Sequence, residues 1–247
     1  MNAPLDLNLK HLHALAAVYH HGGISAAAPH VNLSQPALTQ AIARLEKQLD
    51  APLFDRQPGG MSPTEAAELL VPRIERALAY IAHGVRVARR AQRLPAMPAV
   101  ERRVTLGQLR ALAAVDTAGS FTLAATRAGV SQPAIYRAVH ELSEVIETPL
   151  TVRRGKTVQP TPAATRMLRL VRLALSELSA GVDELASLRS QQGGRVALGV
   201  MPLARAILLP QVLARFARAY PGATVNVIEG PYAELLGDLR EGISANA

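Results

Sequence analysis

The chain has 247 residues and a net charge of +8, and it contains no cysteine, which excludes disulfides, cysteine-ligated zinc and thiol chemistry. No signal peptide opens it, and no apolar run reaches the roughly 18 residues that a membrane span requires, so we expect no membrane partner. The length suits two or three modest domains, and the basic excess is a weak indication of a nucleic-acid partner.

The first predicted unit begins with three short helices. Residues 9–19 keep apolar side chains at helical spacing until Gly22 ends that helix, and an alanine-rich segment leads to a turn at residues 31–33. Ser34 then stands at the expected N-cap of a third helix, with Pro36 in its first turn, where the missing N–H costs nothing. The third helix has a buried apolar stripe of Leu38, Ile42, Leu45 and Leu49. This order predicts a helix-turn-helix.

A short extended segment and a long helix follow. Pro52-Leu53-Phe54 starts an extended stretch that turns at Gly59-Gly60 and ends at Pro63-Thr64, the pattern of a two-stranded wing. Thr64 then caps a helix that runs to about Arg93 with one apolar seam. Because such a long exposed helix usually needs a partner helix, we favour dimerisation through it over packing on its own domain.

The same pattern occurs again 97 residues later. Ser34-Gln35-Pro36-Ala37 recurs as Ser131-Gln132-Pro133-Ala134, and repetition without a gap is the signature of a duplicated unit. The second recognition helix has a buried stripe of Ile135, Val139, Leu142 and Ile146. The second long helix runs from its cap at Thr161 to about Ser190. The chain therefore carries one domain twice.

The remaining segments are a linker and an α/β pattern. Residues 94–98 are broken by prolines and cannot continue either long helix. The last part of the chain is expected to contain a strand at Val196–Val200, a helix at Ala204–Tyr220, a strand at Thr224–Ile228 and a helix at Tyr232–Glu241. That order predicts the beginning of an α/β domain.

The fold class that these patterns predict is mainly α. The expected domains are a first winged helix-turn-helix at 8–66, a linker helix at 67–93, a linker at 94–103, a second winged helix-turn-helix at 104–162, a linker or dimerisation helix at 163–191, and a truncated α/β domain at 194–247. The two winged units hold nearly all of the basic excess, as binding to phosphate requires.

The exposed faces of the two recognition helices are the candidate DNA-reading surfaces, because such a helix offers polar side chains to base edges while its other face stays in the core. The first unit offers Ser34, Gln35, Pro36, Thr39, Gln40 and Arg44, with Arg56 in its wing. The second unit offers Ser131, Gln132, Pro133, Tyr136, Arg137 and His140, with Arg153, Arg154 and Lys156 in its wing. Each cation that contacts a phosphate steepens the slope of log affinity against log salt concentration by about one. We therefore expect the second unit to bind the phosphate backbone of DNA more strongly.

Other chemistry finds little support. His11, His13 and His20-His21 have no acidic or cysteine partner at ligand spacing, so we predict no metal site. Ser34 and Ser131 are explained as N-caps, and no set of nucleophile, base and oxyanion donors can be assembled, so we expect neither an enzyme nor a cofactor. A further group of arginines is open between DNA contact and a solvated helix face: Arg86, Arg89, Arg90, Arg93, Arg102 and Arg103.

Taken together, these residues resemble the LysR-type bacterial transcriptional regulators. The resemblance rests on Ser34-Gln35-Pro36-Ala37 followed by Arg44-Leu45-Glu46, on Pro52-Leu53-Phe54-Asp55-Arg56, on Pro63-Thr64-Glu65-Ala66, and on Gly119-Ser120-Phe121-Thr122-Leu123-Ala124-Ala125 in the second unit. It covers about residues 8–190 as two copies. Residues 194–242 are similar to the opening of the family's effector-binding domain, which has a periplasmic-binding-protein-like fold.

The resemblance implies a sequence-specific DNA-binding transcriptional regulator in the bacterial cytoplasm, associated with the nucleoid through DNA. Its implied partners are double-stranded promoter DNA and further copies of itself, as a homodimer or tetramer through the linker helices. The family also senses a small molecule between two lobes, but a half-lobe cannot enclose one, so we expect no effector here. The alternative is a truncated interaction protein that dimerises with or modulates a full-length regulator without sensing a ligand.

Three features depart from the family's pattern. The family usually has one DNA-binding unit, whereas this chain has two. Pro29 falls inside the second helix, where a proline costs about 3 kcal/mol, and Gln40 and Glu141 stand where basic residues are common, although Arg137 matches. Residues 243–247 do not match the acidic strand that should follow Gly242, which favours a truncated product.

Overall fold

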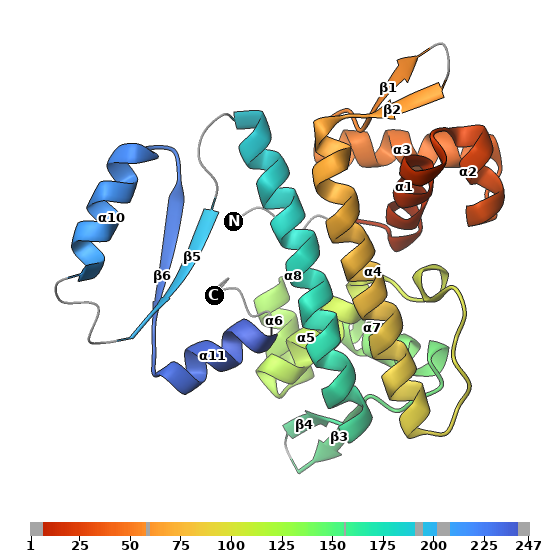
Figure 1. The fold of residues 1–247 in the computed structure, drawn as a ribbon. Coiled ribbons are helices and arrows are strands. Elements are labelled where there is room, and N and C mark those ends of the chain that lie inside the picture. The colour runs from red at the N-terminus through yellow and green to blue at the C-terminus, as the bar shows by residue number, and fades with distance from the viewer. Residues whose placement is uncertain (1–6, 58–59, 156, 191–194, 202–207, 242–247) are drawn as a thin grey trace.

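The computed structural model describes residues 7–57, 60–155, 157–190, 195–201 and 208–241. It contains two winged helix-turn-helix units, a pair of long helices that joins them and a small α/β segment (Figure 1). Among these described residues, no helix combines the length and apolarity needed to cross a membrane.

The first unit has the predicted order of elements. These are α1 (Leu9–His21), α2 (Ile24–Val31), α3 (Gln35–Leu49), β1 (Phe54–Gln57) and β2 (Gly60–Pro63). The backbone of Gly22 is left-handed and ends α1, while the Ser34 hydroxyl accepts from the Ala37 N–H at 3.4 Å and caps α3. All four apolar residues of the predicted α3 stripe are buried. The strands pair antiparallel as a wing, which the Met61 N–H joins to the Gly22 carbonyl.

The second helix continues through its proline. α2 includes Pro29, whose ring is exposed, so no neighbouring element has to move to accommodate it. The opposite face of α2 buries Ala27, Ala28 and Val31 in the core. This tertiary packing keeps the segment helical despite the unfavourable residue.

The second unit repeats the arrangement. Its elements are α5 (Leu106–Ala118), α6 (Phe121–Ala128), α7 (Gln132–Val145), β3 (Thr151–Arg154) and β4 (Thr157–Pro160). Its predicted apolar stripe is buried, and the Val158 N–H bonds the Gly119 carbonyl as Met61 bonds Gly22. Ser131 occupies the N-cap of α7, as expected, but its side chain makes no capping hydrogen bond. The backbone carbonyl of Ser131 instead accepts from Ala134 and Ile135, so the first turn is closed without the hydroxyl.

The two long helices pack along each other. They are α4 (Glu65–Ala91) and α8 (Pro162–Ser190), and a short 3-10 turn, η1 (Val100–Arg102), lies in the link between the units. Gly84 of α4 contacts Leu170 near the start of α8, and Gly181 near the end of α8 contacts Arg73, so the helices run antiparallel (Figure 1). The partner helix that each apolar seam needs is therefore present within the same chain.

The last segment has the predicted strand–helix–strand–helix order. β5 (Arg195–Val200) and β6 (Thr224–Glu229) pair in parallel, with α10 (Leu208–Ala219) between them in sequence and α11 (Tyr232–Glu241) after them. The expected start of the first of these helices, at residues 204–207, lies outside the described residues. Leu235 of α11 packs against Gly199 and Gly230, near the C-terminal ends of the two strands.

Candidate nucleic-acid interface

The exposed face of α3 is the first reading surface, defined here by Thr39, Gln40, Ala43, Arg44 and Lys47. All five side chains are exposed, while Leu38, Ile42 and Leu45 on the opposite face are buried. Ser34, Gln35 and Pro36 are exposed at the start of the helix, and the Ser25 hydroxyl donates to the Gln35 side-chain carbonyl at 3.1 Å. A residue of α2 thus orients a predicted base-contacting side chain of α3.

The exposed face of α7 is the second reading surface, defined here by Tyr136, Arg137, His140, Glu141 and Glu144. All five side chains are exposed, as are the preceding predicted residues Ser131, Gln132 and Pro133. The Arg137 Nε–H donates to the Pro133 carbonyl at 3.4 Å, which leaves the guanidinium on the solvent side of the first helical turn. Arginine there suits a bidentate contact to guanine, whereas Gln40 in α3 suits adenine.

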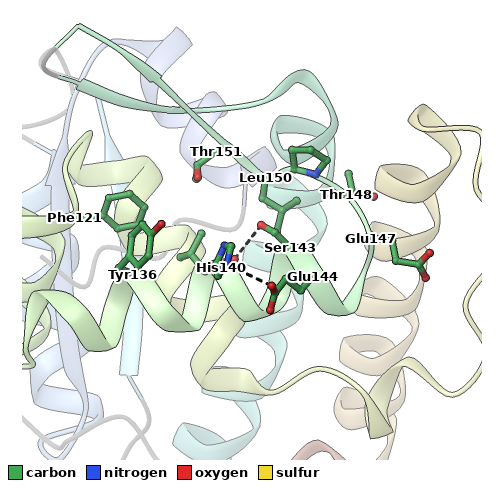
Figure 2. A pocket seen from close by; sticks show the side chains of 11 residues that line it. Phe121, Tyr136, His140, Ser143, Glu144, Glu147, Thr148, Leu150 and Thr151 are labelled. Carbon is green, nitrogen blue, oxygen red and sulfur yellow. Dashed lines mark hydrogen bonds and ion pairs between the residues drawn. The ribbon is translucent and has the colours of Figure 1, made fainter.

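Three aromatic rings lie together on α7 and at the start of α6. The Phe121 and Tyr136 rings meet edge to face with centroids 5.3 Å apart, and the Tyr136 and His140 rings stack at 5.8 Å. His140 Nε2 lies 3.4 Å from a carboxylate oxygen of Glu144. These side chains line a hollow of about 480 Å³ between α7, the start of α6 and β3 (Figure 2). Phe121 was not among the predicted site residues, because only the tertiary structure brings α6 beside α7.

The structure describes the cationic side chains of the second wing more fully than that of the first. Arg153 and Arg154 on β3 are exposed, and the Arg153 Nε–H donates to the Gly155 carbonyl at 3.2 Å across the turn. Lys156 lies outside the described residues, and so does the side chain of Arg56 on β1. The second wing therefore presents two placed cations beside the second reading surface, in a position suited to phosphate.

Two arginines of the open cluster have structural roles. The Arg89 side chain is only 5% exposed and donates to the carbonyls of Pro95 at 2.8 Å and Ile146 at 2.9 Å, and to Glu147 at 2.9 Å. Arg102 of η1 donates to the Val31 carbonyl of α2. Both expectations for Arg89, a DNA contact or a solvated face, were wrong, because its side chain is buried and two of its acceptors, Ile146 and Glu147, lie in a segment far from α4 in sequence.

His11 on α1 lies close enough to Arg44, one of the two cations of the first reading surface, to feel its charge. Burial lowers the pKa of His11 below its ordinary value, and the charges of Arg44 and Lys10 lower it further. Its Nδ1 is buried without a hydrogen-bond partner among the described residues. The neutral ring is therefore the form that the fold accommodates.

We expect the stability of the first unit to fall as the pH drops through about 6.5, because unfolded His11 then binds a proton that folded His11 resists. His11→Gln, which installs the residue found at the equivalent position 108, should remove this part of the pH dependence. The measurement is urea unfolding between pH 7.5 and 5.5, with the exposed His83→Gln as the control. An unchanged pH profile in His11→Gln would contradict the prediction.

The two reading helices, each with a wing and a buried stripe, place the chain in the class of winged helix-turn-helix proteins. The model for the bacterial regulatory helix-turn-helix protein of the lysR family matches residues 9–68 and again 106–165. The model for the LysR substrate binding domain matches residues 189–244. The chain belongs to the LysR family.

Individual relatives agree with this assignment. The HTH-type transcriptional regulator GalR of Pseudomonas putida is 32% identical over 235 residues, which are 95% of this chain and 58% of that protein, so the similarity spans both winged units. A probable hydrogen peroxide-inducible genes activator of Mycobacterium xenopi is 33% identical over 56% of this chain and 73% of that protein.

Solved structures match over a shorter part of the chain. Full-length CbnR in complex with its target DNA is 25% identical, with a TM-score of 0.43, over 56% of this chain and 47% of that one. The C206 mutant of Corynebacterium glutamicum OxyR is 28% identical, with a TM-score of 0.40, over 57% of this chain and 44% of that one. The chain spans 58% of the Pseudomonas relative and 45% of a second curated relative, from Streptomyces viridosporus.

Proposed function

We propose that the chain is a transcriptional regulator that binds double-stranded promoter DNA in a sequence-specific manner through α3 and α7. The observation that carries the proposal is that each recognition helix is anchored by a buried apolar stripe and presents an exposed polar face beside a wing. That combination lets side chains reach base edges while the rest of the unit stays rigid. Membership of a family of regulators supports the same function.

The proposal assigns roles to the predicted site residues. Gln35, Gln40 and Arg137 read bases in the major groove, and the helix N-termini with Arg153 and Arg154 bind phosphates. The proposal keeps the domain division expected from the sequence, with winged units at 8–66 and 104–162. The protein works in the bacterial cytoplasm on the nucleoid, as a DNA-binding protein and not as an enzyme.

The test is a salt series with the full chain. Duplexes from upstream of its own and neighbouring genes are compared with shuffled duplexes of equal composition by fluorescence anisotropy. We expect tighter binding to one natural duplex, and an affinity that falls steeply and linearly in log–log form with salt concentration. Arg153→Gln with Arg154→Gln should reduce the slope by about two without changing the sequence preference.

The matched control for the wing variant is Arg218→Gln, which removes an exposed cation on α10 in the α/β segment. It should leave both the slope and the preference unchanged. Equal binding to natural and shuffled duplexes would instead favour the truncated interaction protein, whose contacts need no base readout.

A further inference from the structure

The long helices are related by a pseudo-two-fold axis. Gly84 contacts Leu170, and the residues 97 positions away from each of these, Gly181 and Arg73, also contact each other. Contacts that occur in both directions between two copies of a repeat require a two-fold relation between the copies. The two winged units therefore have the geometry of a dimer, although they belong to one chain.

One side of this helix pair carries a cluster of charges. The Arg73 Nε–H donates to Glu184 at 2.8 Å and its η nitrogens to Glu184 and Glu177, the latter at 3.0 Å, while Arg76 reaches Glu177 at 3.0 Å. Arg73 and Glu177 are three-quarters or more buried. Burial alone would raise the pKa of Glu177, but Arg76 and Arg73 outweigh it and hold the pKa below its ordinary value. Glu177 is therefore held in its ionised form by the two arginines.

The symmetry-related side lacks these charges. The equivalent of Arg73 is Leu170, and the equivalents of Glu177 and Glu184 are Tyr80 and Val87. When α4 packs against α8, Arg73 meets the two glutamates, and the two-fold relation places Leu170 toward Tyr80 and Val87, so charged side chains face charged ones and apolar side chains face apolar ones. The asymmetry is thus a property of the pairing between unlike helices.

Pairing between like helices would break this match. If α4 packed in the same geometry on α4 of a second copy, each Arg73 would face Tyr80 and Val87 with no carboxylate. If α8 packed on α8, Glu177 and Glu184 would face Leu170. Leaving charges that are more than half buried without partners is strongly unfavourable, so the cluster acts against both homotypic pairs.

The reading surfaces differ as much as the helices do. A shift of 97 residues aligns Thr39 with Tyr136, Gln40 with Arg137, Ala43 with His140, Arg44 with Glu141 and Lys47 with Glu144. Two of the five pairs reverse the charge from basic to acidic, and two others exchange a small side chain for an aromatic ring. Identical base sequences cannot satisfy both surfaces.

We propose that one copy of the chain forms a complete DNA-binding unit with two recognition helices, α3 and α7. This unit binds a DNA site made of two unlike half-sites in inverted orientation. The inference rests on the proposed function. The pseudo-two-fold relation matches the local two-fold symmetry of duplex DNA, which sets the inverted orientation. The unlike surfaces make the site non-palindromic. A homodimer of ordinary winged units would instead select a palindrome.

Engineered disulfides test the pairing directly, because the natural chain contains no cysteine. A Cβ at Gly84 would lie 3.4 Å from the Leu170 Cβ, close to the spacing of a disulfide. Gly84→Cys with Leu170→Cys should oxidise within one chain and migrate at 26.3 kDa on a non-reducing gel. Gly181→Cys with Leu170→Cys, which would bond only across an α8–α8 pair, should stay reduced.

The DNA part uses the oxidised Gly84→Cys/Leu170→Cys chain. We expect it to keep the affinity of the wild type, to sediment with one chain per preferred duplex, and to select a non-palindromic sequence from randomised duplexes. Covalent dimers in either cysteine variant, or two chains on a palindrome, would overturn the inference while the proposed function stood. Loss of all sequence preference in the wild type would mean that the proposed function had failed.

Charge variants distinguish the contribution of the ion pairs around Arg73 from that of the apolar packing between α4 and α8. Arg73→Glu should weaken binding to the two-part site at least about 10-fold, because it places three carboxylates together and loosens the helix pair. Reversing the whole cluster, with Arg73→Glu, Arg76→Glu, Glu177→Arg and Glu184→Arg, should restore most of that loss. Failure of the reversed cluster to restore binding, with the fold intact by circular dichroism, would contradict the role given to these charges.

Discussion

Replacing Arg137 with alanine is expected to weaken binding to the preferred duplex by about 1–3 kcal/mol, or roughly 5- to 150-fold, and to relax selectivity at one base pair. Arg137 is exposed in the first turns of α7, and its ionised donors form stronger hydrogen bonds than the neutral amide of Gln40. Gln40→Ala should therefore cost less. The measurement is anisotropy at one fixed salt concentration with the preferred duplex and its single-base variants.

Arg137→Lys is the matched control for this prediction. Lysine keeps the positive charge but cannot make the forked pair of hydrogen bonds to guanine. If Arg137 reads a base, the lysine variant should lose selectivity nearly as much as the alanine variant. Full activity in Arg137→Lys would show a phosphate contact instead, and equal losses in Arg137→Ala and Gln40→Ala would contradict the dominance of the second unit.

The second large effect is expected at Arg89, where Arg89→Met should lower the free energy of unfolding by about 3–5 kcal/mol. The guanidinium is buried and bridges the end of α4 to the carbonyls of Pro95 and Ile146 and to the carboxylate of Glu147. Methionine fills much of the volume but leaves two carbonyls without their donor. Urea unfolding followed by circular dichroism measures the change.

Two neighbours provide controls for the Arg89 prediction. Glu147 is 62% exposed on its side chain, so Glu147→Gln should cost less than about 1 kcal/mol. Arg90 is exposed on the same helical turn, and Arg90→Met should have a similarly small effect. A loss in Arg89→Met no larger than these two would show that the buried guanidinium contributes little to the link between the units.

The helix pair also changes how the duplication is understood. Each long helix has the apolar seam of a dimerisation helix, yet the seam of α4 is covered by α8 of the same chain. Oligomers of this chain must therefore use other surfaces, unless the helix pair exchanges between copies. The cysteine variants distinguish these two cases, because exchange would produce covalent dimers.

The sequence by itself determined the repeat and the local structure of both winged units. Helices such as α3 and α7 follow from apolar spacing, from residues with N-cap preference and from prolines in their first turns, and the wings follow from glycines and prolines between short extended segments. These signals act over a few residues. The structure therefore has the helices and strands close to their expected bounds.

Only the tertiary structure decided which surfaces meet. An apolar seam fits any other apolar seam, so the stripe of α4 was equally compatible with a second copy and with α8. Two of the acceptors of Arg89, Ile146 and Glu147, and the two glutamates that pair with Arg73 lie 57 to 111 positions away along the chain. Hydrogen bonds and ion pairs over such separations depend on the packed positions of whole helices. These positions minimise the free energy of the entire fold, including the cost of burying charges, rather than that of any local segment.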